Sequence, residues 1–144
     1  MILDVQNLFS DKQSLTPATP ILSTNTIDLG TTGVSPILGQ LPARDVGQGE
    51  PLDLLVQVVE TATGGTSVVA AVIQADDEAL TSNVEVLAQS GVVPLASLVA
   101  GYQFKVPFIP IGITKRFLGV RYTTAGTFTA GQVTAGIVAD RQSR

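Results

Sequence analysis

Residues 98–140, LVAGYQFKVPFIPIGITKRFLGVRYTTAGTFTAGQVTAGIVAD, decide the fold of this chain. Apolar and polar side chains alternate along residues 102–108, again along 118–123, and again along 132–140. A period of two places successive side chains on opposite faces of a β-strand. The stretch therefore predicts three strands joined by two turns, a meander with one face toward solvent.

The same alternation extends toward the middle of the chain. Residues 52–59 alternate and Gly64-Gly65 marks a turn, so residues 52–59 and 66–74 are predicted to form a hairpin. The return strand is apolar on both faces, which requires a central position in a sandwich or cover by a partner subunit. Further short strands are predicted at residues 25–29 and 84–88. Seven or eight short strands with Gly and Pro turns predict an all-β sandwich or jelly roll.

The N-terminal third is less regular. Residues 1–9, MILDVQNLF, fit neither the helical nor the strand period, and are interpreted as a short strand or an extended arm. Residues 10–26 contain Pro17 and Pro20 and predict an extended connection. Residues 30–49 form a loop that is long for a compact domain. We expect one domain over residues 1–144, in which residues 1–24 are an arm or edge segment whose apolar side chains lie against a neighbouring subunit.

The composition predicts that the chain binds other protein subunits. Hydrophobic residues make up 44% of the chain and charged residues 14%, where about 25% charged is usual. Apolar surface is therefore expected at contacts between subunits, and a homo-oligomer is predicted, a dimer in preference to a trimer. No uninterrupted apolar stretch reaches the roughly 20 residues of a membrane-spanning helix. The net charge of −4 and the scattered basic residues predict no nucleic-acid binding.

Enzyme chemistry is not expected. The chain has no His and no Cys, which removes the commonest general base, thiol nucleophile and metal ligands. Asp76, Asp77 and Glu78 lack the alternate spacing of a calcium loop, and a solvated turn is the better interpretation. We predict no catalytic site, no cofactor and no metal.

Two further groups of side chains have two interpretations each. The aromatic residues could form a sugar-stacking platform, but alternation directs several of them inward and Trp is absent, which favours the core. Lys115, Arg116 and Arg121 could meet an acidic partner or could be solvated at a strand end. The sequence alone does not decide between these two interpretations of the basic residues.

Several segments also carry a resemblance. MILDVQNLFSDKQ, STNTIDLG, ARDVGQGEPLDLLVQVVE, IQADDEAL, LVAGYQFKVPFIPIG and KRFLGVRYTTAGTFTAGQVTAGIVADRQ, in this order, resemble the capsid cement (decoration) proteins of tailed bacteriophages. The resemblance spans nearly the whole chain. It implies a jelly-roll β-sandwich that forms a homo-oligomer on the outer surface of the virion and is made in the host cytoplasm. It also implies that the protein bridges neighbouring subunits of the major capsid protein and has no enzymatic activity.

Such a protein stabilises a shell by binding it, so the predicted functional residues are interface residues. The alternative is a jelly-roll module that binds carbohydrate or another host surface. The candidate interface residues are Ile2, Leu3, Val5, Leu8, Phe9, Ile37, Leu38, Leu41, Lys115, Arg116 and Arg121.

Overall fold

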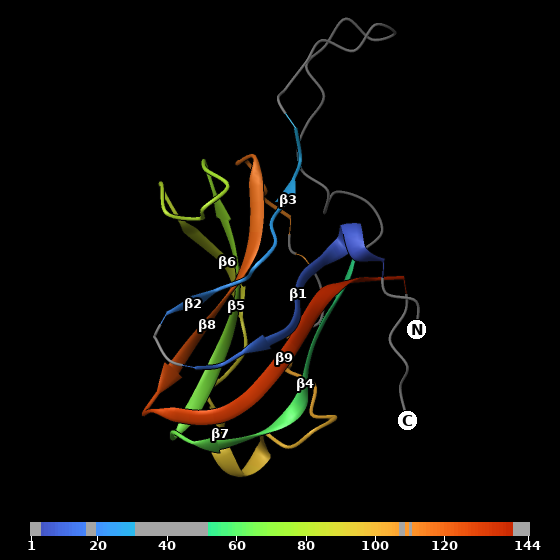
Figure 1. The fold of residues 1–144 in the computed structure, drawn as a ribbon. Helices are drawn as coiled ribbons and strands as arrows, with labels where there is room; N and C mark the ends of the chain where they lie inside the picture. Colours follow the sequence, from blue (N-terminus) through green and yellow to red (C-terminus); the bar gives the residue numbers. More distant parts are fainter. Residues whose placement is uncertain (1–3, 17–19, 31–51, 107–108, 110, 140–144) are drawn as a thin grey trace, which may run out of the picture.

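Two antiparallel sheets face each other in the computed structural model, which describes residues 4–16, 20–30, 52–106, 109 and 111–139 (Figure 1). The three-stranded sheet has the order β1 (Leu8–Ser14), β9 (Phe128–Val138), β4 (Asp53–Gly64). The six-stranded sheet has the order β2 (Ile21–Leu22), β8 (Phe117–Ala125), β5 (Ser67–Ala75), β6 (Glu85–Gln89), with β3 (Ile27–Asp28) paired to β8 and β7 (Val93–Pro94) paired to β5. Two short 3-10 turns are η1 (Val5–Asn7) and η2 (Leu95–Ser97). The predicted all-β sandwich is confirmed.

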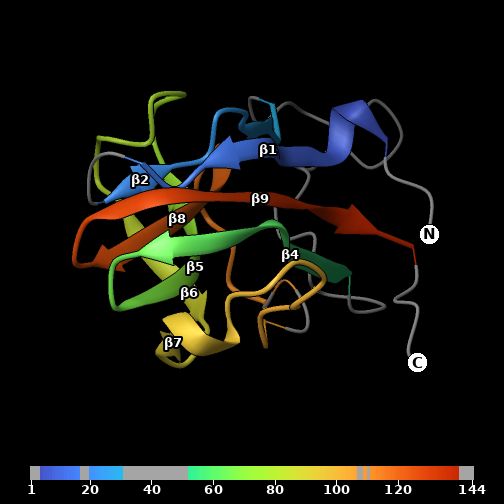
Figure 2. The same cartoon turned by 60° about the horizontal axis from the view of Figure 1, so that its bottom comes forward.

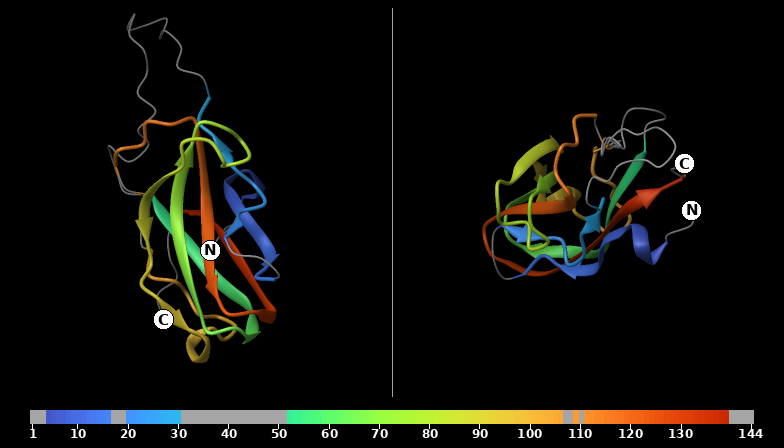
Figure 3. Two further views of the ribbon diagram at one scale, coloured as in Figure 1. Left: turned by 90° about the vertical axis from the view of Figure 1, so that its left-hand side faces the viewer. Right: turned by 90° about the horizontal axis from the view of Figure 1, so that it is seen from above.

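The two sheets face each other in the ribbon views of Figure 3, and the core lies between them. Leu118, Val120 and Tyr122 of β8 are fully buried, as the alternation in the sequence predicted. Leu54, Val56 and Val58 of β4 and Val133 and Ala135 of β9 face them from the other sheet. No helix in the described part of the chain is long and apolar enough to cross a membrane.

Two chain segments cross from one sheet to the other at a single corner. β4 pairs with β9 and β5 pairs with β8, so the connections β4–β5 and β8–β9 run side by side (Figure 2). The amide of Gly65 donates to the carbonyl of Thr127 at 2.7 Å, which ties the two connections together. The predicted hairpin of residues 52–74 and the predicted meander are therefore wrong. A glycine turn with positive φ serves a corner as well as a hairpin, so the turn residues do not reveal which strand is the partner.

Residues 98–106 lie beside β4 without forming the predicted strand. The amide of Val58 donates to Tyr102 and the amide of Phe104 donates to Val56, both at 2.9 Å, but only Gln57 and Gln103 form a strand-like bridge. The alternation still sets burial, because Phe104 and Val106 are buried whereas Gln103 is half-buried and Lys105 is exposed. The segment thus covers the edge of β4 and contributes to the core.

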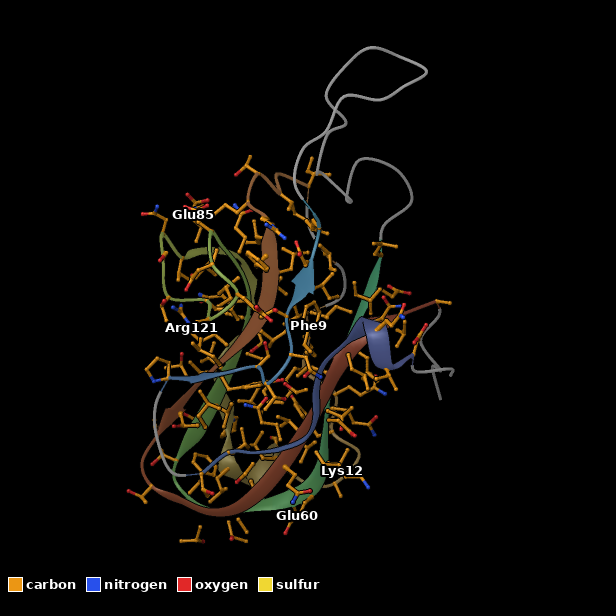
Figure 4. The ribbon with its side chains drawn as sticks, turned by 45° about the horizontal axis from the view of Figure 1, so that its top comes forward. Phe9, Lys12, Glu60, Glu85 and Arg121 are labelled. Atoms are coloured by element: carbon orange, nitrogen blue, oxygen red, sulfur yellow. The ribbon has the colours of Figure 1, made fainter. Side chains whose placement is uncertain are left out.

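The N-terminal segment is part of the chain's own sheet from Leu8 onward. β1 is an edge strand paired to β9, and it includes residues that were predicted to be an extended connection or an arm. Phe9 is fully buried, and Figure 4 shows it in the middle of the molecule. Register shifts on both sides of Ser10 and a φ of 46° at Lys12 interrupt the regular period of β1. Such bulges conceal a strand from a search for alternation.

A buried chain of polar groups connects β1 to the six-stranded sheet. The hydroxyl of Tyr122 donates to Ser10 at 2.9 Å, and Ser10 donates to the side-chain oxygen of Gln13 at 2.6 Å. The side-chain Nε2 of Gln13 in turn donates to the backbone carbonyl of Leu22 at 2.6 Å. Burial raises the pKa of Tyr122 above its ordinary value, and the hydrogen bond to Ser10 offsets only part of this rise. The network holds the bulged edge strand in place.

We therefore expect stability to fall in alkaline solution. Because the pKa of Tyr122 is higher in the folded protein, the unfolded chain loses this proton first, from about pH 10 upward. The contribution of Tyr122 is constant below pH 10 and decreases above it by up to about 1.4 kcal/mol per pH unit. Urea denaturation of the wild-type protein and of Tyr122→Phe at pH 8 and pH 11 tests this. The variant should lose less stability between the two pH values, and equal losses would contradict the prediction.

The strand predicted to be apolar on both faces is β5, and it is central in the larger sheet. Its inner side chains join the main core, whereas Ala71, Ile73 and Ala75 on the outer face pack against Leu80. Leu22, Val84 and Phe117 add to this second cluster. The chain itself thus covers much of this outer face, so β5 no longer indicates contact with a partner subunit.

Candidate interface surfaces

The predicted interface residues near the N-terminus have different positions. Ile2 and Leu3 lie outside the described residues, as do Ile37, Leu38 and Leu41 of the long loop. Val5, on η1, has 78% of its surface exposed, whereas Leu8 has 9% exposed and Phe9 none. Only Val5 among the described apolar candidates can therefore offer its side chain to a partner without a change in the fold.

Leu8 packs within its own subunit. It pairs with Gly136 of β9, which in turn pairs with Leu55 of β4, so the three residues form one row across the outer face of the sheet. A Cβ placed on Gly136 would lie 3.0 Å from Leu8 Cδ2, which shows that the leucine lies over the glycine. Leu8 thus fills the space that a side chain at Gly136 would occupy, and its packing stabilises the sheet.

Lys115 is paired inside its own chain. Its ammonium lies 3.4 Å from Glu85 and 3.9 Å from Asp76, and it also donates to the carbonyl of Asn83. Only 12% of the side chain is exposed. Gln74, itself buried, completes the arrangement, because it donates to Glu85 and accepts from the amide of Lys115. Reversing the charge of Lys115 would place three carboxylates together, so we expect this change to destabilise the fold.

Arg116 also has a partner in its own subunit. Its guanidinium donates to both oxygens of Asp28, each at 2.7 Å, and lies 5.0 Å from the centre of the Phe117 ring. The pKa of Arg116 is raised chiefly by the hydrogen bond to Asp28, with a smaller contribution from Glu78. This bidentate pair joins β3 to β8. Because the pair is well exposed to solvent, we expect it to contribute little to stability.

Arg121 differs from the other two cations. It lies in β8, in register with Leu22 and Ala71 on the outer face of the larger sheet. Its Nε is buried, and no hydrogen-bond partner for this atom is found among the described residues. Figure 4 shows Arg121 at the side of the molecule formed by the six-stranded sheet. Of the three basic candidates, Arg121 is the one most available to an acidic partner.

The acidic segment at 76–78 is a turn whose geometry is set by hydrogen bonds. The carboxylate of Asp77 accepts from the amides of Thr81 and Ser82 and from the Thr81 hydroxyl, at 2.6–2.8 Å. The hydroxyl of Thr81 is the largest influence on the pKa of Asp77, which it lowers. Within the described ranges, no group of three or more His, Cys, Asp or Glu could hold a metal ion.

Most aromatic side chains lie in the core. Phe104, Tyr122 and Phe128 are buried, and Tyr102 and Phe117 are half-buried, whereas Phe108 lies outside the described residues. The rings of Tyr102 and Phe104 meet edge to face with centres 5.6 Å apart. The interpretation of the aromatic residues as core is confirmed for most of them, and no sugar-stacking platform is found among the described residues.

A polar groove was not predicted from the sequence. It has a volume of about 440 Å³ and lies between η1, the segment that connects β2 to β3, and the turn after β5. The residues that line it are Val5, Gln6, Leu8, Ser23, Thr24, Asn25, Thr26, Glu78 and Ala79. These residues come from three distant parts of the sequence, so only the fold could reveal that they meet.

The fold defines the class of protein, which is an all-β sandwich of two antiparallel sheets. Residues 9–137 match the model of the protein family described as Bbp16, so the chain belongs to the Bbp16 family. The match covers all of the described strands except Leu8 and Val138 at the two ends. A search among curated proteins found no match.

Proposed function

We propose that this protein is a cement protein of a tailed-bacteriophage head. It would bind the outside of the icosahedral shell, bridge neighbouring subunits of the major capsid protein and stabilise the shell by mass action, without catalysis. The observation that carries the proposal is the ordered resemblance to cement proteins. The segments that carry it contribute to β1, β3, β4, β8 and β9, so the resemblance extends over both sheets and is not confined to one motif.

The proposal includes a jelly-roll topology. A jelly roll consists of two facing sheets formed when an antiparallel ribbon wraps around a core. Here the paired segments β4–β5 and β9–β8 form such a ribbon, because both bend together at the corner of Gly65 and Gly126. Residues 98–106 beside β4 supply a fourth segment to the smaller sheet. The strand order supports this topology.

Not all of the eleven candidate residues remain candidates for the attachment surface. Since Leu8 and Phe9 are buried and Lys115 and Arg116 are paired internally, the exposed Val5 and the half-buried Arg121 remain as described candidates. Ile2 and Leu3 are separated from Val5 only by Asp4 in the sequence, and Ile37, Leu38 and Leu41 are apolar residues of the long loop. We assign attachment to these residues, with the homo-oligomer, a dimer in preference to a trimer, as the binding unit.

The proposal predicts that charge placed at Val5 weakens attachment. Heads of the phage that encodes the chain would be prepared without this protein and mixed with purified protein, and bound protein would be measured after sedimentation. Val5→Asp should bind at least about tenfold more weakly, because burial of a charge opposes apolar contact. Val92→Asp is the matched control, since Val92 is also an exposed valine but lies next to β7. Equal binding of both variants would exclude Val5 from the attachment surface.

The alternative function, binding of carbohydrate or of a host surface through aromatic rings, loses its main support. A platform requires exposed rings, and the described aromatic side chains are buried or half-buried. Recognition of a saccharide would need other side chains.

A further inference from the structure

The polar groove beside η1 has the features of a preformed binding site. Its volume of about 440 Å³ lies within the usual range of small-molecule sites, roughly 300–1,000 Å³. Each of its three walls is held by contacts to the sandwich. A ligand would therefore find the groove largely in place, and little ordering would oppose binding.

The wall formed by residues 23–26 is fixed by hydrogen bonds to both sheets. Ser23 Oγ accepts from the amide of Val120 at 3.1 Å and donates to the carbonyl of Asn25 at 2.9 Å. The amide of Asn25 donates to the carbonyl of Phe9, also at 2.9 Å. These bonds occupy the backbone of the wall and the hydroxyl of Ser23, while the side chains of Thr24 and Asn25 stay exposed.

The other two walls are anchored by their ends. Glu78 and Ala79 directly precede Leu80, whose side chain is 2% exposed and packs over Gly119 on the larger sheet. Gln6 lies on η1, which is capped by the carboxylate of Asp4 and leads directly into β1. The buried residues next to each wall thus set its position.

Four polar side chains in the groove have no partner among the described residues: those of Gln6, Thr24, Asn25 and Thr26 make no hydrogen bond or ion pair. Glu78 makes no hydrogen bond there, but it interacts electrostatically with Arg116, whose pKa it helps to raise. Amides and hydroxyls both donate and accept, and an ionised carboxylate accepts. The groove therefore presents mixed donors and acceptors together with one negative charge, and Val5 and Ala79 add small apolar surfaces.

This set of groups selects among ligand classes. No Lys or Arg lines the groove, and the nearby Arg116 is already paired with Asp28, so phosphates and other anions would meet the negative charge of Glu78 without a free cation in the groove. One carboxylate without a second acidic group is a poor cation site. A neutral saccharide fits, because its hydroxyls can donate to Glu78 and exchange hydrogen bonds with the amides, while its C–H surface contacts Val5.

We propose that this groove binds a neutral saccharide unit. Since no aromatic ring lines it, each site is weak, with a dissociation constant in the range of about 1–10 mM. The binding itself is a property of the isolated protein.

The test is a titration of the isotopically labelled full chain, followed by amide chemical shifts. The probes are the methyl glycosides of glucose, galactose, mannose and N-acetylglucosamine, with N-acetylneuraminic acid as an anionic probe. We expect one neutral glycoside to move the amides of residues 5–8, 23–26 and 78–79 in a saturable way, and the anionic probe to move them at least about tenfold more weakly.

Two variants connect the shifts to the groove. Asn25→Ala and Glu78→Ala should each weaken binding by about tenfold, since each removes a hydrogen-bonding group. Glu60→Ala is the control, because Glu60 lies on β4 of the smaller sheet (Figure 4), does not line the groove, and should bind as the wild type does. No saturable shift with any neutral probe, shifts outside the groove, or unchanged binding by both groove variants would overturn the proposal. Binding of a capsid-protein peptide in the groove instead would also overturn it, while leaving the cement function intact.

Discussion

Replacing Phe9 with alanine is expected to lower the free energy of unfolding by about 3–5 kcal/mol. Phe9 is fully buried between the sheets, and truncation would leave a cavity lined by core side chains. The loss is a large fraction of the roughly 5–15 kcal/mol that stabilises a typical domain. Chemical denaturation followed by circular dichroism measures it directly.

Val5→Ala is the matched control for Phe9→Ala. Val5 lies four residues earlier and is 78% exposed, so its truncation should change stability by less than about 0.5 kcal/mol. Because Phe9 is part of the core, we expect deletion of residues 1–9 to unfold the protein. An arm that did not contribute to the core could be removed without this effect. A folded deletion variant, or a cost below about 1 kcal/mol for Phe9→Ala, would contradict the placement of β1 in the sandwich.

Replacing Gly65 with alanine is expected to destabilise the corner between the sheets by about 2–5 kcal/mol. Gly65 has a φ of 62°, a conformation that side chains rarely adopt. A Cβ there would lie 2.6 Å from Phe128 Cζ and closer still to other atoms of that buried ring. Backbone strain and displacement of the ring both oppose the substitution. Thermal and chemical denaturation of the purified variant test the expectation.

Two other glycines separate these causes. Gly101 has a φ of 93° but open space around its Cβ position, so Gly101→Ala should show the cost of strain alone, about 1–2 kcal/mol. Gly91 has neither feature, and Gly91→Ala should be nearly neutral. If Gly65→Ala costs no more than Gly101→Ala, the close packing of the corner against Phe128 is wrong.

The sequence predicted well which side chains are buried. Alternation identified the inward faces of β4, β8 and β9, because period two depends only on the geometry of a strand. It did not predict which strands pair, since Gly64-Gly65 suits a hairpin and a corner equally. It also missed β1, where the bulges around Ser10 and the positive φ of Lys12 interrupt the alternation.

The candidate sites depended on contacts between distant residues, and here the sequence alone was insufficient. Lys115 meets Glu85, which lies 30 positions earlier in the sequence, and Arg116 meets Asp28, which lies 88 positions earlier. Their charges suggested an external partner until the fold supplied internal ones. The groove offered no periodic signal, because its polar side chains belong to three short irregular segments.

The attachment of this protein to a phage head is the central claim, and one measurement tests it most directly. A cryo-electron-microscopy reconstruction of intact heads of the phage that encodes the chain would show whether the sandwich lies on the outer surface. We expect density for the two sheets at the junctions between major capsid protein subunits, with the N-terminal end bearing Val5 directed toward the shell. Heads that contain the chain at no surface position, in a preparation where it is expressed, would contradict the proposed function.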